Sequence, residues 1–89
     1  MSIQLLIADD HQVVIDGIVN MLENAADIEV VGSVMDGAAV LTFLEQRAAE
    51  VVLLDLDMPI MDGLSVCKAM QTRFPQTKVI ALTLSLIHI

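Results

Sequence analysis

Residues 51–63 of this 89-residue chain read VVLLDLDMPIMDG. Four apolar residues, Val51 to Leu54, run directly into Asp55, and Pro59 prevents a regular strand from continuing further. An uninterrupted apolar run of this kind predicts a strand buried on both faces, as in a parallel sheet. Because ligands of open parallel α/β sheets bind beyond the carboxyl ends of the strands, Asp55 is expected where such a fold performs its chemistry.

A second apolar run, residues 3–8, also ends in acids, Asp9 and Asp10. If the strand order reverses between the two runs, these carboxylates and that of Asp55 converge on one crevice. Mutual repulsion would raise the proton affinity of at least one of these carboxylates or favour the binding of a cation between them. Mg²⁺ fits, because it binds carboxylate and carbonyl oxygens together with water and substrate phosphate. With such an ion in place, Asp55 could attack a phosphoryl group as an anionic nucleophile and form an aspartyl-phosphate.

These acids also have an ordinary structural explanation. Asp10 or His11 could cap the helix that follows, and for the pair Asp9-Asp10 taken alone capping is the favoured interpretation. Asp55 favours a functional site over capping, because burying an acid at the end of an apolar strand costs free energy that capping does not explain. Asp57 is expected in a loop, where its backbone carbonyl matters more than its side chain. His11 is expected to be a partly exposed residue at the start of a helix rather than a base.

Strands and helices alternate along the whole chain. We predict strands at 3–8, 28–34, 51–54 and 78–83, and helices at 12–25, at 37–47 and from the 59–63 loop to about residue 73. This order predicts right-handed crossovers and one doubly wound α/β domain of three layers with a parallel sheet. Gly17, inside the first helix, suggests close packing there. The apolar faces expected for the first and third helices are Val14, Ile18, Met21, Leu22 and Ala25, and Leu64, Cys67, Met70 and Phe74.

Composition narrows the class of protein. The chain is 56% apolar with a net charge of −8, which favours a core-rich fold and disfavours direct binding of nucleic acid. Cys67 is the only cysteine, so no internal disulfide framework is possible and a buried core role is expected for it. No segment approaches the roughly 20 apolar residues of a membrane span, and no secretory signal begins the chain. We therefore expect a cytoplasmic protein.

Three segments, IADDHQVVIDG, LLDLDMPIMDGL and KVIALT, resemble in order and spacing the receiver domain of a two-component response regulator. The Asp-Asp-His triplet and the DLDMPIMDG run most resemble the LuxR-type subfamily, which carries a C-terminal helix-turn-helix. The resemblance covers residues 2 to about 83 and implies a flavodoxin-like fold. It also implies a non-enzymatic signalling domain that takes phosphate from a histidine kinase. It implies two further partners. One is a second copy of the chain, in a homodimer that forms on phosphorylation, and the other is DNA, which would be contacted only through a further C-terminal domain.

The resemblance also assigns roles to single residues. Asp55 corresponds to the phosphoacceptor. Asp9 and Asp10 correspond to the acidic pair that holds Mg²⁺ together with Asp55, and Asp10 is the direct ligand of the pair. Asp57 corresponds to the position that lends its backbone carbonyl to the ion. Thr83 corresponds to the hydroxyl that bonds the phosphoryl group and relays the switch.

The chain departs from the receiver pattern after the fourth strand. Receivers have a fifth strand with a phosphate-pairing Lys and two further helices, and none is recognisable here. We therefore expect a truncated receiver at 1–83, with four strands and three helices, and a non-native tail at 84–89. The tail, LSLIHI, resembles translated sequencing-adapter DNA.

Two other functions stay open at this point. A phosphohydrolase of the haloacid dehalogenase type also places Asp-x-Asp after an apolar strand, which Asp55 and Asp57 match, but Met58-Pro59 departs from its motif. An inert receiver fragment or pseudo-receiver is the other alternative. The intact acids argue against a degenerate site, whereas truncation argues for inertness.

Overall fold

The computed structural model describes residues 2–56 and 63–82. Within them the strands form one parallel sheet in the order β2 (Ile28–Val34), β1 (Ile3–Ala8), β3 (Val51–Asp55), β4 (Lys78–Leu82). The predicted doubly wound α/β fold is thus confirmed, and the strand order does reverse between β1 and β3. In chain order the elements are β1 (Ile3–Ala8), α1 (Gln12–Leu22), β2 (Ile28–Val34), α2 (Gly37–Gln46), β3 (Val51–Asp55), α3 (Gly63–Arg73) and β4 (Lys78–Leu82).

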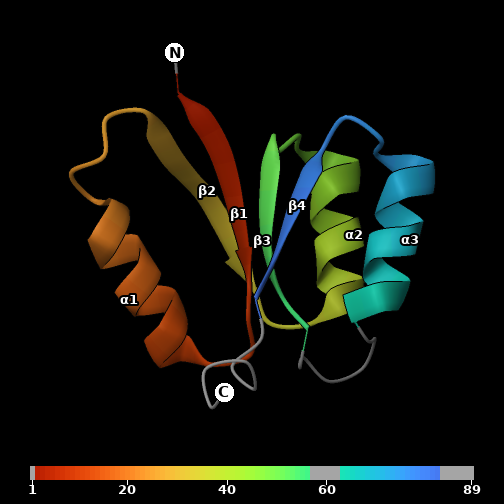
Figure 1. Cartoon of the computed structure of the whole chain (residues 1–89), viewed down its shortest axis with the longest axis horizontal. Helices are drawn as coiled ribbons and strands as arrows, with labels where there is room; N and C mark the ends of the chain where they lie inside the picture. The colour runs from red at the N-terminus through yellow and green to blue at the C-terminus, as the bar shows by residue number, and fades with distance from the viewer. Residues whose placement is uncertain (1, 57–62, 83–89) are drawn as a thin grey trace.

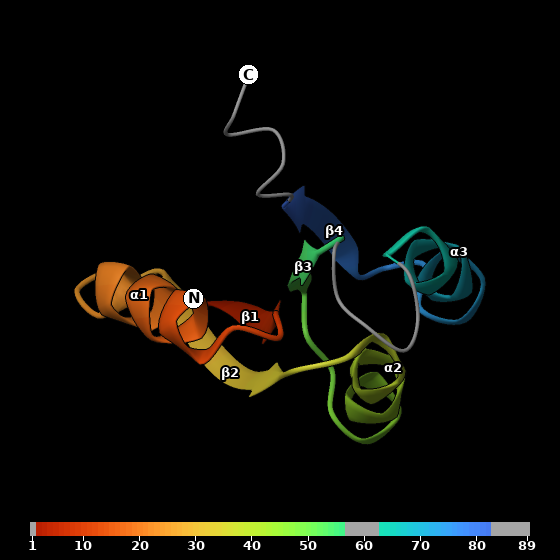
Figure 2. The same ribbon diagram turned by 90° about the horizontal axis from the view of Figure 1, so that it is seen from below.

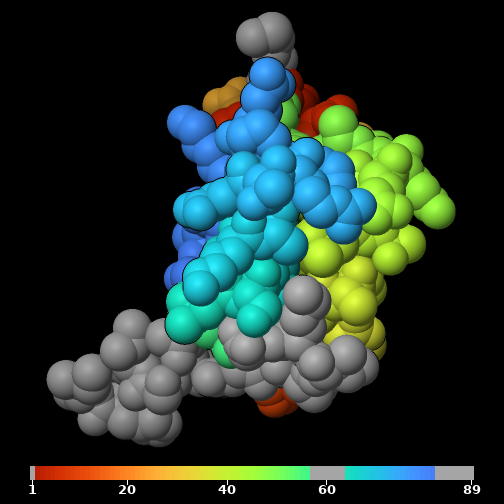
Figure 3. All heavy atoms as spheres, turned by 90° about the vertical axis from the view of Figure 1, so that its right-hand side faces the viewer, coloured from red at the N-terminus to blue at the C-terminus, as the bar shows by residue number. Residues whose placement is uncertain are grey.

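Helices lie on both faces of the sheet. Figure 1 shows α1 on one side of the strands and α2 with α3 on the other, and Figure 2 shows the same division from below. In Figure 3, α3 (cyan) lies beside α2 (yellow-green) on one face. This arrangement follows from the topology, because the crossover from β1 to β2 and the two later crossovers run in opposite directions across the sheet.

Strand β1 is buried on both faces and joins the two halves of the core. Leu6 and Ala8 belong to the cluster under α2 and α3, whereas Leu5 and Ile7 pack with Ile15 of α1. All five side chains are buried. Double coverage explains why β1 is apolar without the alternation that a half-exposed strand shows.

The two predicted helix faces were each partly wrong. Met21 is 81% exposed, and the buried residue of α1 is Ile15, which packs with Ile18 and Leu22. Helix α1 also ends at Leu22, before the predicted residue 25. Spacings of three and seven residues from Ile15 lie on one side of a helix, whereas Met21 is turned about 100° around the helix from Leu22 and out of that side.

Helix α3 shows a similar rotation. Leu64 is 71% exposed, whereas Val66 and Met70 are fully buried in the cluster with α2. Cys67 and Phe74 are partly buried against that cluster, so the expected inward placement of this free cysteine holds in part. The buried pair is spaced by four residues, the spacing that keeps side chains on one helical face.

Sheet coverage is uneven on the α1 side. Val51 and Leu53 of β3 are only partly buried there, and Ile80 of β4 is 53% exposed. In the described sheet β4 is an edge strand, paired with β3 alone. An edge strand next to exposed apolar surface is a template for association between chains.

Two glycines have opposite surroundings. The close packing expected at Gly17 is wrong, because a Cβ built there would meet nothing within 4 Å. At Gly32 in β2, a Cβ would lie 2.7 Å from Cε2 of Phe43, closer than carbon atoms approach without displacement. The ring of Phe43 thus packs directly on the strand backbone, and Gly32 is the residue that makes room for it.

We predict that Gly17→Ala and Gly32→Val change stability in opposite directions. The first removes a helix-interior glycine without any clash and raises the free energy of unfolding by about 0.5–1 kcal/mol. The second drives a branched side chain into Phe43 and lowers it by about 1–3 kcal/mol. Urea titrations followed by circular dichroism test both, and a stable Gly32→Val variant would contradict the packing described.

Candidate functional site

The carboxyl ends of β1 and β3 place two acids side by side. Ala8 pairs with Leu54, so that Asp9 and Asp55 follow at the same level of the sheet. Asp55 is the last residue of β3 and also pairs with Leu82 of β4. Both acids are buried, with 3% of Asp9 and 2% of Asp55 exposed. The predicted convergence of carboxylates at the strand reversal is therefore present.

Asp9 is held by backbone contacts on both of its sides. Its N–H donates to the carbonyl of Val34 at 3.0 Å, which continues the pairing of β1 with β2 by one residue. Its Oδ1 accepts from the backbone N–H of His11 at 2.8 Å. This turn keeps residues 9–11 at the crevice before the chain enters α1.

Capping does not account for the acidic pair. The N-cap residue of α1 is His11, and it forms no side-chain capping hydrogen bond. Asp36 shows the contrasting case, because its carboxylate accepts from the N–H of Ala39 at 2.8 Å and caps α2. The capping interpretation favoured for Asp9 and Asp10 alone is thus wrong, since the local turn directs these acids to the crevice instead.

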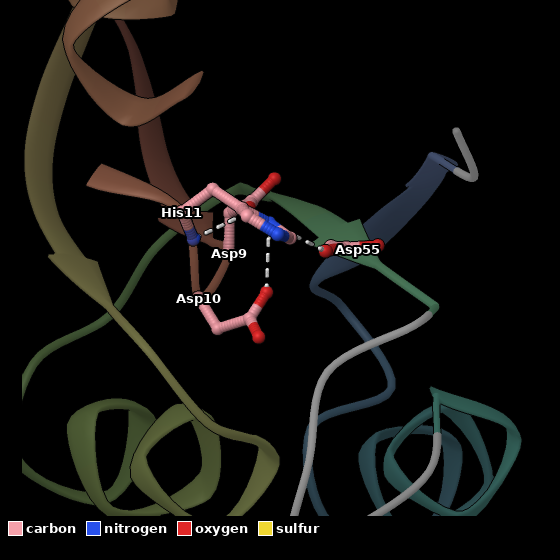
Figure 4. Close-up of side chains that lie close together, drawn as sticks. All are labelled: Asp9, Asp10, His11 and Asp55. Carbon is pink, nitrogen blue, oxygen red and sulfur yellow. Dashed lines mark hydrogen bonds and ion pairs between the residues drawn. The ribbon is translucent and has the colours of Figure 1, made fainter. Parts of the chain in front are cut away.

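His11 lies among the acids rather than apart from them. Its Nδ1 is 3.0 Å from Oδ1 of Asp9, 2.9 Å from Oδ1 of Asp10 and 4.0 Å from Oδ2 of Asp55. Figure 4 shows the imidazole reaching from the end of β1 toward Asp55 on β3. Half of the His11 side chain is exposed, which agrees with the prediction. Its position within the carboxylate cluster was not predicted. The only sequence signal for it is its place directly after the acidic pair.

The donor set of this cluster fits a divalent cation. One ligand atom from each of Asp9, Asp10, His11 and Asp55 lies within 4.8 Å of all the others. Among the residues that the structure describes, Oδ1 of Asp10 is buried without a hydrogen-bond partner, and its ion-pair contact is with His11. Buried carboxylate oxygens in such a group are suitable ligands for Mg²⁺. Asp57 and Thr83, also predicted for this site, lie outside the described residues.

The acids raise the pKa of His11 above its ordinary value of 6.5. The main cause is the hydrogen bond from Nδ1 to Asp9, followed by the charge of Asp10. Burial opposes the increase, and the charges of Asp9 and Asp55 add to it. A protonated imidazole is favoured because it offsets the negative charge of the crevice.

We predict that an NMR titration of the metal-free protein gives His11 a pKa above 6.5 and that Asp9→Asn lowers it. The folded-state pKa is raised, so the stabilisation from protonated His11 is complete below its unfolded pKa and is lost as pH rises through the folded pKa. Asp16→Asn, which alters an exposed acid of α1, is the control and leaves the titration unchanged. A His11 pKa at its ordinary value in the unsubstituted protein would contradict the contact with Asp9.

Comparison with known proteins identifies the family. The profile of the response regulator receiver domain matches residues 5–86. The chain belongs to this receiver family. The isolated receiver domain of RcsB from Salmonella enterica, determined with phosphomimetic BeF₃⁻, matches with a TM-score of 0.87 and 35% identity over 93% of this chain and 62% of that one. The sequence-based prediction of the family and of its fold is confirmed.

Curated relatives of this receiver carry different names. A transcriptional regulatory protein, YhcZ of Bacillus subtilis, is 41% identical over 90% of this chain. A protein-glutamate methylesterase/protein-glutamine glutaminase of Chromobacterium violaceum is 38% identical over 96% of it. The chain spans only 37% and 24% of these two relatives. None of the helices in the described ranges has the length and apolar character that crossing a membrane requires.

Proposed function

We propose that this receiver accepts a phosphoryl group from a histidine kinase on Asp55. The observation that carries the proposal is the buried carboxylate of Asp55 at the end of β3, grouped with Asp9 and Asp10 across the strand reversal. The backbone that carries this carboxylate is fixed by strand pairing, because Asp55 pairs with Leu82 of β4 and the preceding Leu54 pairs with Ala8 of β1. Fixed orientation favours an attack in line with the leaving group.

The neighbouring residues supply further requirements of such a site. Asp9 is anchored by Val34 and His11, while Oδ1 of Asp10 is available for an ion. A bound Mg²⁺ would offset the repulsion between these carboxylates and an incoming phosphate. In this proposal Asp57 contributes its backbone carbonyl, and Thr83 bonds the phosphoryl group and relays the switch.

Phosphorylation would then act as a signal. It adds nearly two negative charges and new acceptor oxygens beside β4, which can bias a two-state element. Transcription is the output we propose, through homodimers and a DNA-binding domain further along the parent chain, in the cytoplasm. The name of YhcZ and solved structures of RcsB dimers bound to DNA support this proposal. An enzymatic output is the alternative that the methylesterase relative favours.

We predict one phosphoryl group per chain when the protein is incubated with acetyl phosphate and Mg²⁺. Asp55→Ala abolishes this labelling because it removes the nucleophile, and Asp10→Asn reduces it strongly because it removes an ion ligand. Intact-protein mass spectrometry measures both. Asp16→Asn, which removes an acid from the exposed face of α1, is the matched control and labels normally.

Two results would contradict this function. Labelling that persists in Asp55→Ala would place the phosphoryl group elsewhere. Continuous release of phosphate from a generic ester would indicate the dehalogenase-type hydrolase, which the receiver family match does not favour.

We also predict that Mg²⁺ stabilises the folded chain through this site. An ion that binds only the native state raises the free energy of unfolding by RT ln(1 + [L]/Kd), about 2.7 kcal/mol at one hundred times Kd. Thermal unfolding with and without Mg²⁺ measures the effect, and Asp10→Asn should lose most of it. An equal response in wild type and Asp10→Asn would place the ion outside the cluster.

A further inference from the structure

The imidazole of His11 supplies a donor of a different kind to the carboxylate cluster. Its Nδ1 lies 2.9 and 3.0 Å from one oxygen each of Asp10 and Asp9 and 4.0 Å from an oxygen of Asp55. An ion held by the three acids would therefore have a nitrogen ligand within reach. The hydrogen bond from Nδ1 to Asp9 already keeps the ring in this position.

Ions differ in whether they accept such a nitrogen. Mg²⁺ is a hard ion that prefers oxygen ligands and water, so its binding gives imidazole no role. Zn²⁺ and Co²⁺ bind imidazole nitrogen well and accept carboxylate oxygens beside it. Tetrahedral Zn²⁺ has ligand bonds of about 2.0–2.2 Å, which places neighbouring ligand atoms about 3.3–3.6 Å apart. The three distances from Nδ1 bracket that spacing.

We propose that His11 is a metal ligand that lets this acidic crevice hold Zn²⁺ or Co²⁺ in a four-ligand site with Asp9, Asp10 and Asp55. Binding would release the proton of Nδ1 to solvent, so that the metal–nitrogen bond replaces the hydrogen bond to Asp9. Mg²⁺ would use the carboxylates without His11. The two kinds of ion thus compete for one place but differ in whether the imidazole is bound. His11 sets the metal preference of the cluster.

A regulatory consequence follows, and it rests on the proposed function. A site closed by four protein ligands leaves no open position for a phosphate oxygen, and it engages the oxygen of Asp55 that would attack. Zn²⁺ would then inhibit phosphorylation of Asp55 in competition with Mg²⁺. Removing His11 would relieve the inhibition while leaving the oxygen ligands in place.

The test uses Co²⁺ as a spectroscopic probe, without any phosphate donor. Co²⁺ is titrated into the wild-type chain and its visible absorption is recorded, because tetrahedral Co²⁺ absorbs far more strongly than octahedral Co²⁺. The same titration is run on His11→Ala and His11→Asn. The matched controls are His88→Ala, which removes the chain's other imidazole, and Cys67→Ser, which removes its thiol.

We expect tetrahedral bands in the wild type and in both controls. The His11 variants should lose these bands and bind Co²⁺ at least about tenfold more weakly, whereas their Mg²⁺ affinity should not fall, because the imidazole that competes for the carboxylates is gone. Nitrogen NMR of the wild type with Zn²⁺ provides an independent readout, with a shift at Nδ1 of His11. This measurement does not depend on the folding of any variant.

The proposal is overturned if the bands persist in His11→Ala, if they vanish in either control, or if Zn²⁺ leaves Nδ1 of His11 unshifted. Failure of the proposed function would look different. In that case Asp55 would not be labelled by acetyl phosphate with Mg²⁺ in a zinc-free buffer, whatever the Co²⁺ spectra show.

Discussion

The parallel pairing of β1 with β3 is the constraint on which the rest of this structure depends. The register that sets Ala8 against Leu54 brings the acids after each strand to one level of the sheet. A slip of one residue would turn the side chains of one strand to the opposite face and separate the carboxylates. The apolar core on both faces opposes such a slip, because Val52 packs under α2 and α3 whereas Leu53 packs on the α1 side, and the slip would exchange their surroundings.

The same pairing makes the crevice electrostatically costly. Asp9 and Asp55 are nearly inaccessible to water, and Asp10 adds a third carboxylate beside them. Carboxylates this close repel one another, and burial increases the penalty because water screens them poorly. His11 offsets part of the charge from the open side of the crevice. A site that depends on an added positive charge is well suited to binding a cation, because occupation removes the repulsion that folding created.

The sequence predicted the features that depend on a local pattern of residues. It missed features that depend on how a helix is rotated about its axis or on contacts between residues distant in the sequence. The apolar runs before Asp9 and Asp55 were sufficient to place both strands, whereas the crevice between them was predicted only on the condition that the strand order reverses there. The helix faces were harder, because apolar residues make up 56% of the chain and therefore mark a buried face poorly. Met21 and Leu64 are apolar yet exposed. The close contact at Gly32 joins separate elements and left no local pattern to read.

His11 shows why the site could be predicted only in part. Its exposure follows from its place at the start of α1, but its proximity to Asp55 depends on the pairing of two strands distant in sequence. Oδ1 of Asp9 accepts both the backbone N–H and the ring Nδ1 of His11, so the turn that directs the acids to the crevice also orients the imidazole. An ion such as Mg²⁺, which binds oxygen rather than nitrogen, must compete with this ring for the carboxylates. An ion such as Zn²⁺, which binds nitrogen well, can take the ring as an additional ligand. The choice of ion and the position of His11 are therefore coupled.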